Sequence, residues 1–176
     1  MKFSVEDRTR FSRELVYTTH RDRFVEIAPT LDEVASVRRL SSSRDAKGVV
    51  VQRHDWQGSS AALPVFLRPM VPEGLLRWTD EVVWDPAAWT ATWTITLPGL
   101  GPVADIRGVN RYTQLRHGCK IVLDGNVAFH AEHIPQMKLP PGTAKIIERF
   151  VVALVVPLLK KSGKAVIATL ESEHPQ

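Results

Sequence analysis

Alternating apolar and polar residues are the clearest pattern in the chain. From Trp89 to Leu97, apolar residues occupy every second position and threonines fill the positions between them. A period of two is typical of a β-strand that buries one face. The same alternation predicts a second strand over residues 119–131, where Cys119, Ile121 and Leu123 share one face.

Five further strands follow from shorter alternations and from the turn residues between them. They are predicted over residues 2–11, 34–42, 48–57, 75–84 and 105–115. Turn-forming residues at Asp45–Gly48, Asp85–Pro86 and Arg116–Gly118 join neighbouring strands into hairpins. The pattern therefore predicts a mostly antiparallel sheet of about seven strands.

A helical segment follows the first strand. Ser12 is placed to cap a helix over residues 13–27, and Pro29 stops it. The segment forms either one helix or two short ones. Because the later strands follow one another without intervening helices, the chain has the order of an α+β fold.

A longer helix is predicted from Ala144 to about Glu171, after a proline-rich loop. Pro157 lacks an amide hydrogen and predicts a kink near residues 153–158. The apolar residues that recur at intervals of three and four are Ile147, Phe150, Val151, Leu154 and Leu158. Further apolar residues widen this face, namely Val152, Val155, Val156 and Leu159. The wide apolar surface leaves a dimer contact, a cavity wall and a transient membrane contact open.

Composition narrows the class of protein. The 176 residues are 44% hydrophobic and 24% charged, as in a soluble globular protein, and they suffice for one domain over residues 1–176. The first residues carry charges instead of an apolar signal segment, and the longest apolar run, 150–159, is shorter than the roughly 20 residues that span a bilayer. A single cysteine, Cys119, fits a reducing compartment. We therefore expect a cytoplasmic protein without a transmembrane segment.

The net charge of +4 does not predict a nucleic-acid partner. Basic and acidic residues alternate along the chain, as in the segment from Glu6 to Glu14, instead of forming a basic block. Such mixed charge is typical of a solvated surface. We therefore expect no binding of nucleic acid.

Motifs for metal or cofactor chemistry are weak. The cluster His130–His133 is the strongest metal candidate, but on a strand His130 and Glu132 share a face and His133 points away. The glycines of residues 99–101 join two strands and do not open a helix, so they do not predict a phosphate site. We expect no metal and no cofactor.

Polar residues on the strand over residues 105–115 are the remaining sign of an enzyme. Asn110, Tyr112 and Gln114 share one face of this strand, and Arg107 and Arg111 share the other. Both faces are mixed in character, so the sequence leaves open which one points inward.

Several phrases of the sequence resemble those of a known superfamily. They are residues 67–85, the strand over 89–97 and the helix entry over 138–157. Together with the order of elements, they are similar to bacterial members of the START-like (SRPBCC) helix-grip superfamily, which includes lipid-transfer and polyketide-cyclase domains. The resemblance covers the whole chain. It implies a curved antiparallel sheet wrapped around a long C-terminal helix, short helices after the first strand, and an internal apolar cavity.

The implied function is the binding or transport of a small apolar ligand, such as a lipid, a sterol or a polyketide-like molecule, without catalysis. The inward strand face offers large apolar groups for this cavity, among them Trp84, Trp89 and Ile121, although such residues equally form an ordinary core. We expect the ligand to contact Trp78, Trp93, Tyr112, Leu123, Phe129, Phe150 and Leu154.

Two other classes of function stay open. One is an enzyme that resembles polyketide cyclases or dehydratases and uses Tyr112 with an arginine. The other is a protein-interaction module that uses the apolar terminal helix or a sheet edge, as a homodimer or with a different partner.

Overall fold

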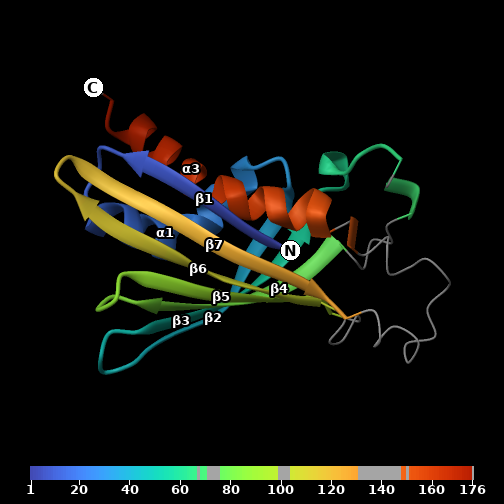
Figure 1. Cartoon of the computed structure of the whole chain (residues 1–176), viewed down its shortest axis with the longest axis horizontal. Helices are drawn as coiled ribbons and strands as arrows, with labels where there is room; N and C mark the ends of the chain where they lie inside the picture. Colours follow the sequence, from blue (N-terminus) through green and yellow to red (C-terminus); the bar gives the residue numbers. More distant parts are fainter. Residues whose placement is uncertain (67, 71–75, 99–103, 131–147, 150, 176) are drawn as a thin grey trace.

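Seven antiparallel strands form one sheet in the order β1-β7-β6-β5-β4-β3-β2. The computed structural model describes residues 1–66, 68–70, 76–98, 104–130, 148–149 and 151–175. The strands are β1 (Lys2–Thr9), β2 (Val34–Arg44), β3 (Val50–Gly58), β4 (Arg77–Asp85), β5 (Thr90–Thr96), β6 (Ala104–Leu115) and β7 (Gly118–Phe129). Strands β2 to β7 follow one another as a meander, and β1 pairs with β7 (Figure 1). The predicted α+β arrangement is confirmed.

A helix follows the first strand, as the sequence predicts. Helix α1 (Arg13–Ile27) begins after Ser12, whose side-chain oxygen accepts a hydrogen bond from the amide of Leu15 at 3.3 Å. A short 3-10 helix, η1 (Ala28–Thr30), continues it and contains Pro29. Of the two alternatives that the sequence leaves open, the chain therefore forms one continuous α-helix. Two further 3-10 turns, η2 (Ser60–Ala62) and η3 (Arg68–Met70), lie between β3 and β4.

The C-terminal helix changes its geometry before Pro157. A π-helical turn, η8 (Val151–Val155), precedes the regular helix α3 (Val156–Glu173). Pro157 cannot donate to the carbonyl one turn earlier, and a π-helical turn shifts the hydrogen-bond pattern at this point. The irregularity expected here therefore takes the form of a π turn. Residues 144–147 and Phe150, at the start of the predicted helix, lie outside the described residues.

The two helices pack against the apolar side of the sheet. Helix α3 contacts β1, and helix α1 contacts β6, β7 and α3 (Figure 1). The ring of Tyr17 on α1 forms edge-to-face contacts with Trp84, Trp89 and Tyr112, at centroid distances of 5.3, 5.2 and 5.1 Å. This aromatic cluster fixes α1 over the sheet.

Trp89 occupies a different place from the one its alternation with Trp93 predicts. Strand β5 begins at Thr90, and Trp89 lies in the preceding turn with a positive φ of 54°. Its ring packs against Tyr17, and the guanidinium of Arg13 lies 4.0 Å from the ring centroid. The strand therefore begins one residue later than the sequence predicts, because Trp89 belongs to the hairpin turn.

The structure shows which face of β6 points inward. Asn110 and Tyr112 are buried, whereas Arg107 and Arg111 are exposed. Gln114, two residues further on, lies near the end of the strand, where its amide donates to the carbonyl of Gly118 at 2.8 Å. Asn110 and Tyr112 therefore share the buried side of the sheet with the tryptophans.

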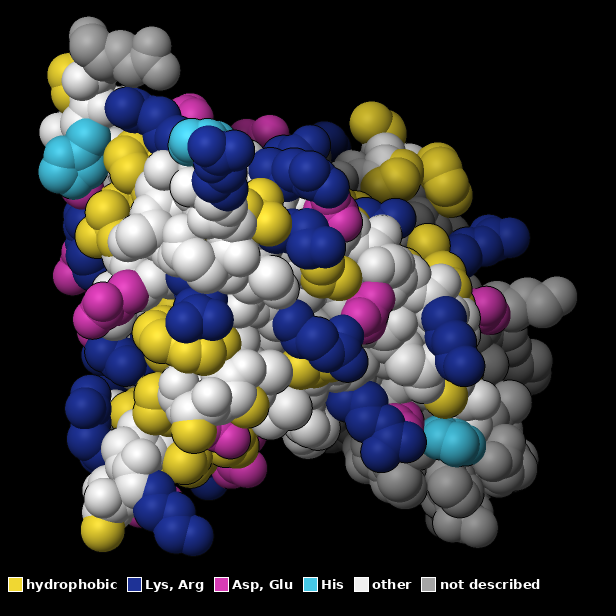
Figure 2. Space-filling view, turned by 60° about the vertical axis from the view of Figure 1, so that its left-hand side comes forward, with side chains coloured by type: hydrophobic (Ala, Val, Ile, Leu, Met, Phe, Trp, Pro, Cys, Tyr) yellow, Lys and Arg dark blue, Asp and Glu magenta, His cyan; other side chains and the backbone are white. Residues whose placement is uncertain are grey.

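Charged side chains of both signs lie interspersed on the surface shown in Figure 2. Several form ion pairs, including Arg77 with Asp55 and Arg23 with Glu173, each at 2.6 Å. The mixed charge along the chain is therefore also mixed in space. Within the described residues, no helix combines the length and apolar character that crossing a membrane requires.

Candidate functional site: a tryptophan-lined cavity

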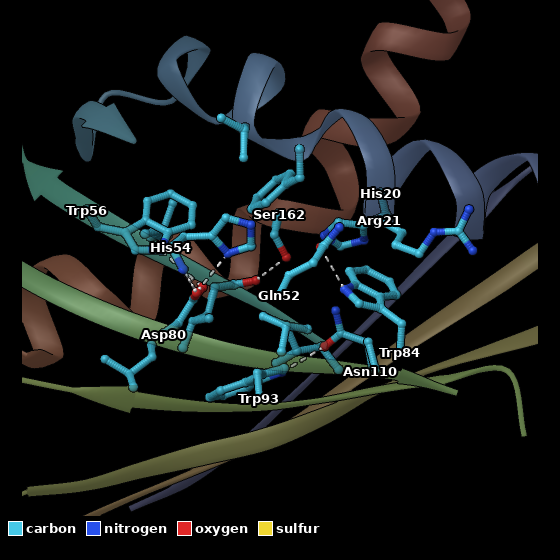
Figure 3. A pocket seen from close by; sticks show the side chains of 18 of the residues that line it. His20, Arg21, Gln52, His54, Trp56, Asp80, Trp84, Trp93, Asn110 and Ser162 are labelled. Atoms are coloured by element: carbon cyan, nitrogen blue, oxygen red, sulfur yellow. Dashed lines mark hydrogen bonds and ion pairs between the residues drawn. The ribbon is translucent and has the colours of Figure 1, made fainter. Parts of the chain in front are cut away.

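A cavity lies between the sheet and the two helices. Its free space is about 60 Å³, and strands β3 to β7 and helices α1 and α3 line it (Figure 3). The polar side chains on its wall are His20, Arg21, Gln52, His54, Asp80, Asn110 and Ser162. Such a concentration of polar groups is more than an ordinary apolar core contains.

Tryptophans form much of the remaining wall. Trp56, Trp78, Trp84 and Trp93 all line the cavity, and all are at least 94% buried. Trp56 and Trp78 are cross-strand partners, and their rings stack with an interplanar angle of 7° and a centroid distance of 6.0 Å. The cavity therefore offers flat aromatic surfaces together with polar groups.

The strand register explains why these residues meet. On β3, Gln52, His54 and Trp56 are spaced by two and point to the same face. His54 pairs directly with Asp80 on β4, as Trp56 pairs with Trp78. Since paired residues in an antiparallel sheet lie side by side, the register brings a histidine and a carboxylate together inside the cavity.

Asp80 holds His54 in a fixed orientation. Oδ1 of Asp80 lies 2.8 Å from Nδ1 of His54 and accepts from the His54 amide at 3.2 Å, while Oδ2 accepts from the indole Nε1 of Trp56 at 3.0 Å. A carboxylate only accepts hydrogen bonds, so Nδ1 of His54 carries the proton of this contact. In the neutral ring, Nε2 of His54 then has a free lone pair.

A second polar chain links β5, β6 and α1. The indole Nε1 of Trp93 donates to Oδ1 of Asn110 at 3.1 Å, and the hydroxyl of Tyr112 lies 2.7 Å from Nδ1 of His20. Since an indole N–H can only donate, Asn110 must turn its oxygen toward Trp93. Its NH₂ group then donates to the hydroxyl of Tyr112, an interaction that acts to lower the pKa of Tyr112.

The direction of this chain fixes the tautomer of His20. The oxygen of Tyr112 accepts from Asn110, and within the described residues Nδ1 of His20 is the acceptor available to its O–H, so this O–H donates to Nδ1. Burial lowers the pKa of His20 to about 4, so its ring is neutral at physiological pH and carries its proton on Nε2. Burial also raises the pKa of Tyr112 above its ordinary value, which keeps the hydroxyl protonated.

Gln52 and Arg21 of the cavity wall also have hydrogen-bond partners. The indole Nε1 of Trp84 donates to Oε1 of Gln52 at 3.1 Å, and Gln52 is buried. Arg21 of α1 makes two hydrogen bonds of 2.7 Å to the neighbouring carboxylate of Asp22. Three of the four cavity tryptophans therefore have their N–H bonded to a polar side chain, which fixes the planes of their rings.

The residues expected to contact a ligand fall into three groups. Trp78, Trp93 and Leu123 line the cavity. Tyr112 is buried behind the wall and bonds to His20. Leu154 is buried in the core next to Gly58, and Phe129 is half-buried at the end of β7. The last, Phe150, lies outside the described residues, as do residues 131–133 of the candidate metal cluster.

Six polar residues of the wall were not predicted from the sequence, namely His20, Arg21, Ser162, Gln52, His54 and Asp80. A signal for the last three was present, because they alternate with tryptophans and valines on the predicted strands over 48–57 and 75–84. Only the pairing of β3 with β4 shows that His54 and Asp80 are neighbours. His20 lies in a helix of mixed polarity, where its spacing carries no comparable signal.

Comparison of the fold with solved structures shows extensive similarity at low sequence identity. The Thermus thermophilus protein TTHA0849 is 16% identical, with 99% of each chain covered and a TM-score of 0.65. The ZhuI aromatase/cyclase from Streptomyces sp. R1128 is 16% identical, covering 98% of this chain and 96% of its own, with a TM-score of 0.60. The protein Ara h 8.0201 is 11% identical, covering 96% and 98%, with a TM-score of 0.55.

These similarities define the fold class. The chain has the helix-grip fold of START-like, SRPBCC proteins, as its sequence resemblance indicates. No protein-family model matches the sequence, and no curated protein matches it by sequence. Of the three structural neighbours described above, ZhuI is an aromatase/cyclase.

Proposed function

We propose that the protein binds a small, mainly apolar molecule in the cavity between the sheet and helices α1 and α3. The observation that carries this proposal is the lining of one cavity by four tryptophans and a set of oriented polar side chains. Ligand sites have this composition, since apolar walls supply affinity and a few polar groups fix the orientation of the ligand. The expected contacts with Trp78, Trp93 and Leu123 form part of this proposal.

The size of the cavity sets a condition on binding. Its free space of about 60 Å³ is less than the roughly 150 Å³ that accommodates benzene in an engineered cavity. A ring-sized ligand therefore requires side chains of the wall to move. Burial of its apolar surface, worth roughly 25 cal/mol per Å², would offset the cost of this movement.

A pair of substitutions on β5 tests the proposal. Ala91 lines the cavity and is fully buried, whereas Thr92 is exposed on the opposite face of the same strand. Ala91→Val fills the free space and should abolish ligand binding, while Thr92→Val should leave it unchanged. Native mass spectrometry of the purified protein and titration with a panel of lipids and aromatic compounds measure binding. The absence of any bound molecule for the unaltered protein in both measurements would refute the proposal.

A second candidate function, catalysis by proton transfer, is favoured by the contact between His54 and Asp80. An imidazole that donates one N–H to a carboxylate has the arrangement of a general base, with its other nitrogen available for a substrate proton. The similarity to an aromatase/cyclase in fold supports this candidate by analogy. The arginine on the cavity wall is Arg21 from α1, since Arg107 and Arg111 are exposed on the other face of the sheet.

Hydrogen exchange of a simple ketone distinguishes catalysis from binding alone. The protein is incubated with acetophenone in D₂O, and deuterium incorporation into the methyl group is followed by NMR. Catalysis predicts exchange above the buffer rate that His54→Asn removes, because asparagine keeps a donor for Asp80 but lacks the second nitrogen. Equal exchange rates for the two proteins would exclude this role of His54.

A further inference from the structure

The two cavity histidines present opposite hydrogen-bonding groups. In its neutral form, His54 donates through Nδ1 to Asp80, which leaves Nε2 as an acceptor. His20 accepts through Nδ1 from Tyr112, which leaves Nε2–H as a donor. Each tautomer is fixed by the hydrogen bond that Nδ1 makes with a neighbouring side chain. Moving the proton to the other ring nitrogen would therefore break a buried hydrogen bond.

Both of these remaining nitrogens face accessible space. Within the described residues, neither Nε2 has a hydrogen-bond partner, and the only buried side-chain atom without one is Oε2 of Glu33. The Nε2 atoms are therefore not fully buried atoms without a hydrogen-bond partner. The side chains of His20 and His54 both lie around the cavity (Figure 3), and both residues are otherwise buried, so the cavity is the space open to these atoms.

We propose that the cavity selects ligands that carry both a hydroxyl group, which donates to Nε2 of His54, and a carbonyl oxygen, which accepts from Nε2–H of His20. The class of ligand is a neutral aromatic hydroxyketone, because the tryptophans around these atoms offer faces for a planar ring. This inference rests on the proposed function, since it names the ligand class for the same cavity.

Neutral ligands are favoured over charged ones by the same contacts. The proton that His54 shares with Asp80 and the neutral state of His20 leave no unpaired cation among the described residues of the wall, since Arg21 is bonded to Asp22. A ligand carboxylate would have to lie near the carboxylate of Asp80 without a free positive partner among these groups. A hydroxyl and a carbonyl match the available lone pair and N–H without adding charge.

A series of isosteric ligands tests the proposal on the whole protein. Meta- and para-hydroxyacetophenone carry both groups at two different separations. In the corresponding methylacetophenones a methyl group replaces the hydroxyl, and in the ethylphenols a methylene replaces the carbonyl. Binding is measured by ligand-observed NMR and calorimetry. For the better isomer, removing either group should weaken binding about tenfold, because each removal leaves one polar group of the cavity unpaired.

Two variants assign each preference to its histidine. His54→Asn retains a donor near Nδ1 for Asp80 but removes Nε2, so it should abolish the preference for hydroxyl over methyl and keep the preference for carbonyl. His20→Asn retains an acceptor for Tyr112 and should have the opposite effect. Circular dichroism checks that each variant folds, and if one does not, the other variant and the ligand series on the unaltered protein decide the result.

The possible outcomes separate this inference from the proposed function. Loss of one preference in each variant supports the assignment. Equal binding of the hydroxyketones and their isosteres would overturn it, while the proposed binding function would stand. A uniform loss of affinity in both variants would also overturn it, because it would show a structural role only. If none of the ring compounds binds and no other ligand is found, both proposals fail.

Discussion

The indole ring of Trp93 lies directly over Gly108, its cross-strand partner on β6. A Cβ atom at Gly108 would lie 2.3 Å from Cζ2 of Trp93 and 2.3 Å from the carbonyl oxygen of Asp124. Only a residue without a side chain allows the ring to lie flat against the sheet at this position. Gly108 therefore helps to set one wall of the cavity, together with Asn110, which holds the indole N–H.

Gly108→Ala should displace the ring of Trp93 and reduce the free energy of unfolding by about 1 to 3 kcal/mol, since the added methyl group overpacks the interior. Urea denaturation followed by tryptophan fluorescence measures both effects. Arg107→Ala, at the neighbouring exposed position, serves as the control and should change neither. An unchanged free energy of unfolding for Gly108→Ala would contradict the close packing.

Acid should destabilise the protein through His20. The folded-state pKa is about 4 and the ordinary value is 6.5, so the neutral ring contributes stability above pH 6.5 that is lost as the pH falls toward 4. The difference corresponds to a loss of the order of 3 kcal/mol. Urea denaturation between pH 7.5 and pH 4 measures it, and His20→Asn should flatten the profile. His117→Asn, at an exposed position, should leave the profile as it is.

Asp7 should have the opposite effect on the dependence of stability on pH. Its carboxyl is buried against helix α3 at Gly163, and desolvation raises its pKa despite the nearby charge of Lys164. A raised pKa means that the ionised form costs stability, and this cost appears as the pH rises through the folded-state pKa. Asp7→Asn should therefore raise the free energy of unfolding at pH 7, with the difference vanishing near pH 3. Equal stability at pH 7 would argue against the desolvated carboxyl.

Lys161 is expected to stabilise the protein by pairing with a buried carboxylate. Its Nζ lies 2.6 Å from Oε1 of Glu33, which is buried and has Oε2 without a partner in the described part of the chain. Lys161→Met should reduce the free energy of unfolding by about 1 to 3 kcal/mol, because it leaves the carboxylate unpaired. Adding Glu33→Gln should recover part of the loss, and Lys160→Met at the exposed neighbouring position should cost less.

Cys119 should be unreactive in the folded protein. The thiol is buried and desolvation raises its pKa, so little thiolate forms at neutral pH. We expect a thiol reagent such as DTNB to react about a hundredfold more slowly in buffer than in denaturing urea. Similar rates in the two conditions would show that the strand β7 opens readily.

Much of the fold could be predicted from local patterns. The alternation around Trp93, the cap at Ser12 and the effect of Pro157 are each encoded within a few residues, since strand, helix and turn preferences act over short distances. Where prediction failed, as at Trp89, the exact start of a hairpin depended on packing against α1. The buried face of β6 could not be chosen locally either, because both of its faces contain polar residues.

The sequence by itself determined the order of the elements, the antiparallel α+β class and the resemblance to the helix-grip superfamily. The tertiary structure alone decided which polar residues share the cavity. His54 meets Asp80 through the register of β3 and β4, although 26 positions separate them, and Tyr112 meets His20 across 92 positions. Local propensity cannot specify such pairs, because they depend on the alignment of strands and the docking of α1. Their physical effect, the fixed tautomers of two buried histidines, therefore emerges only when the sheet and the helices pack together.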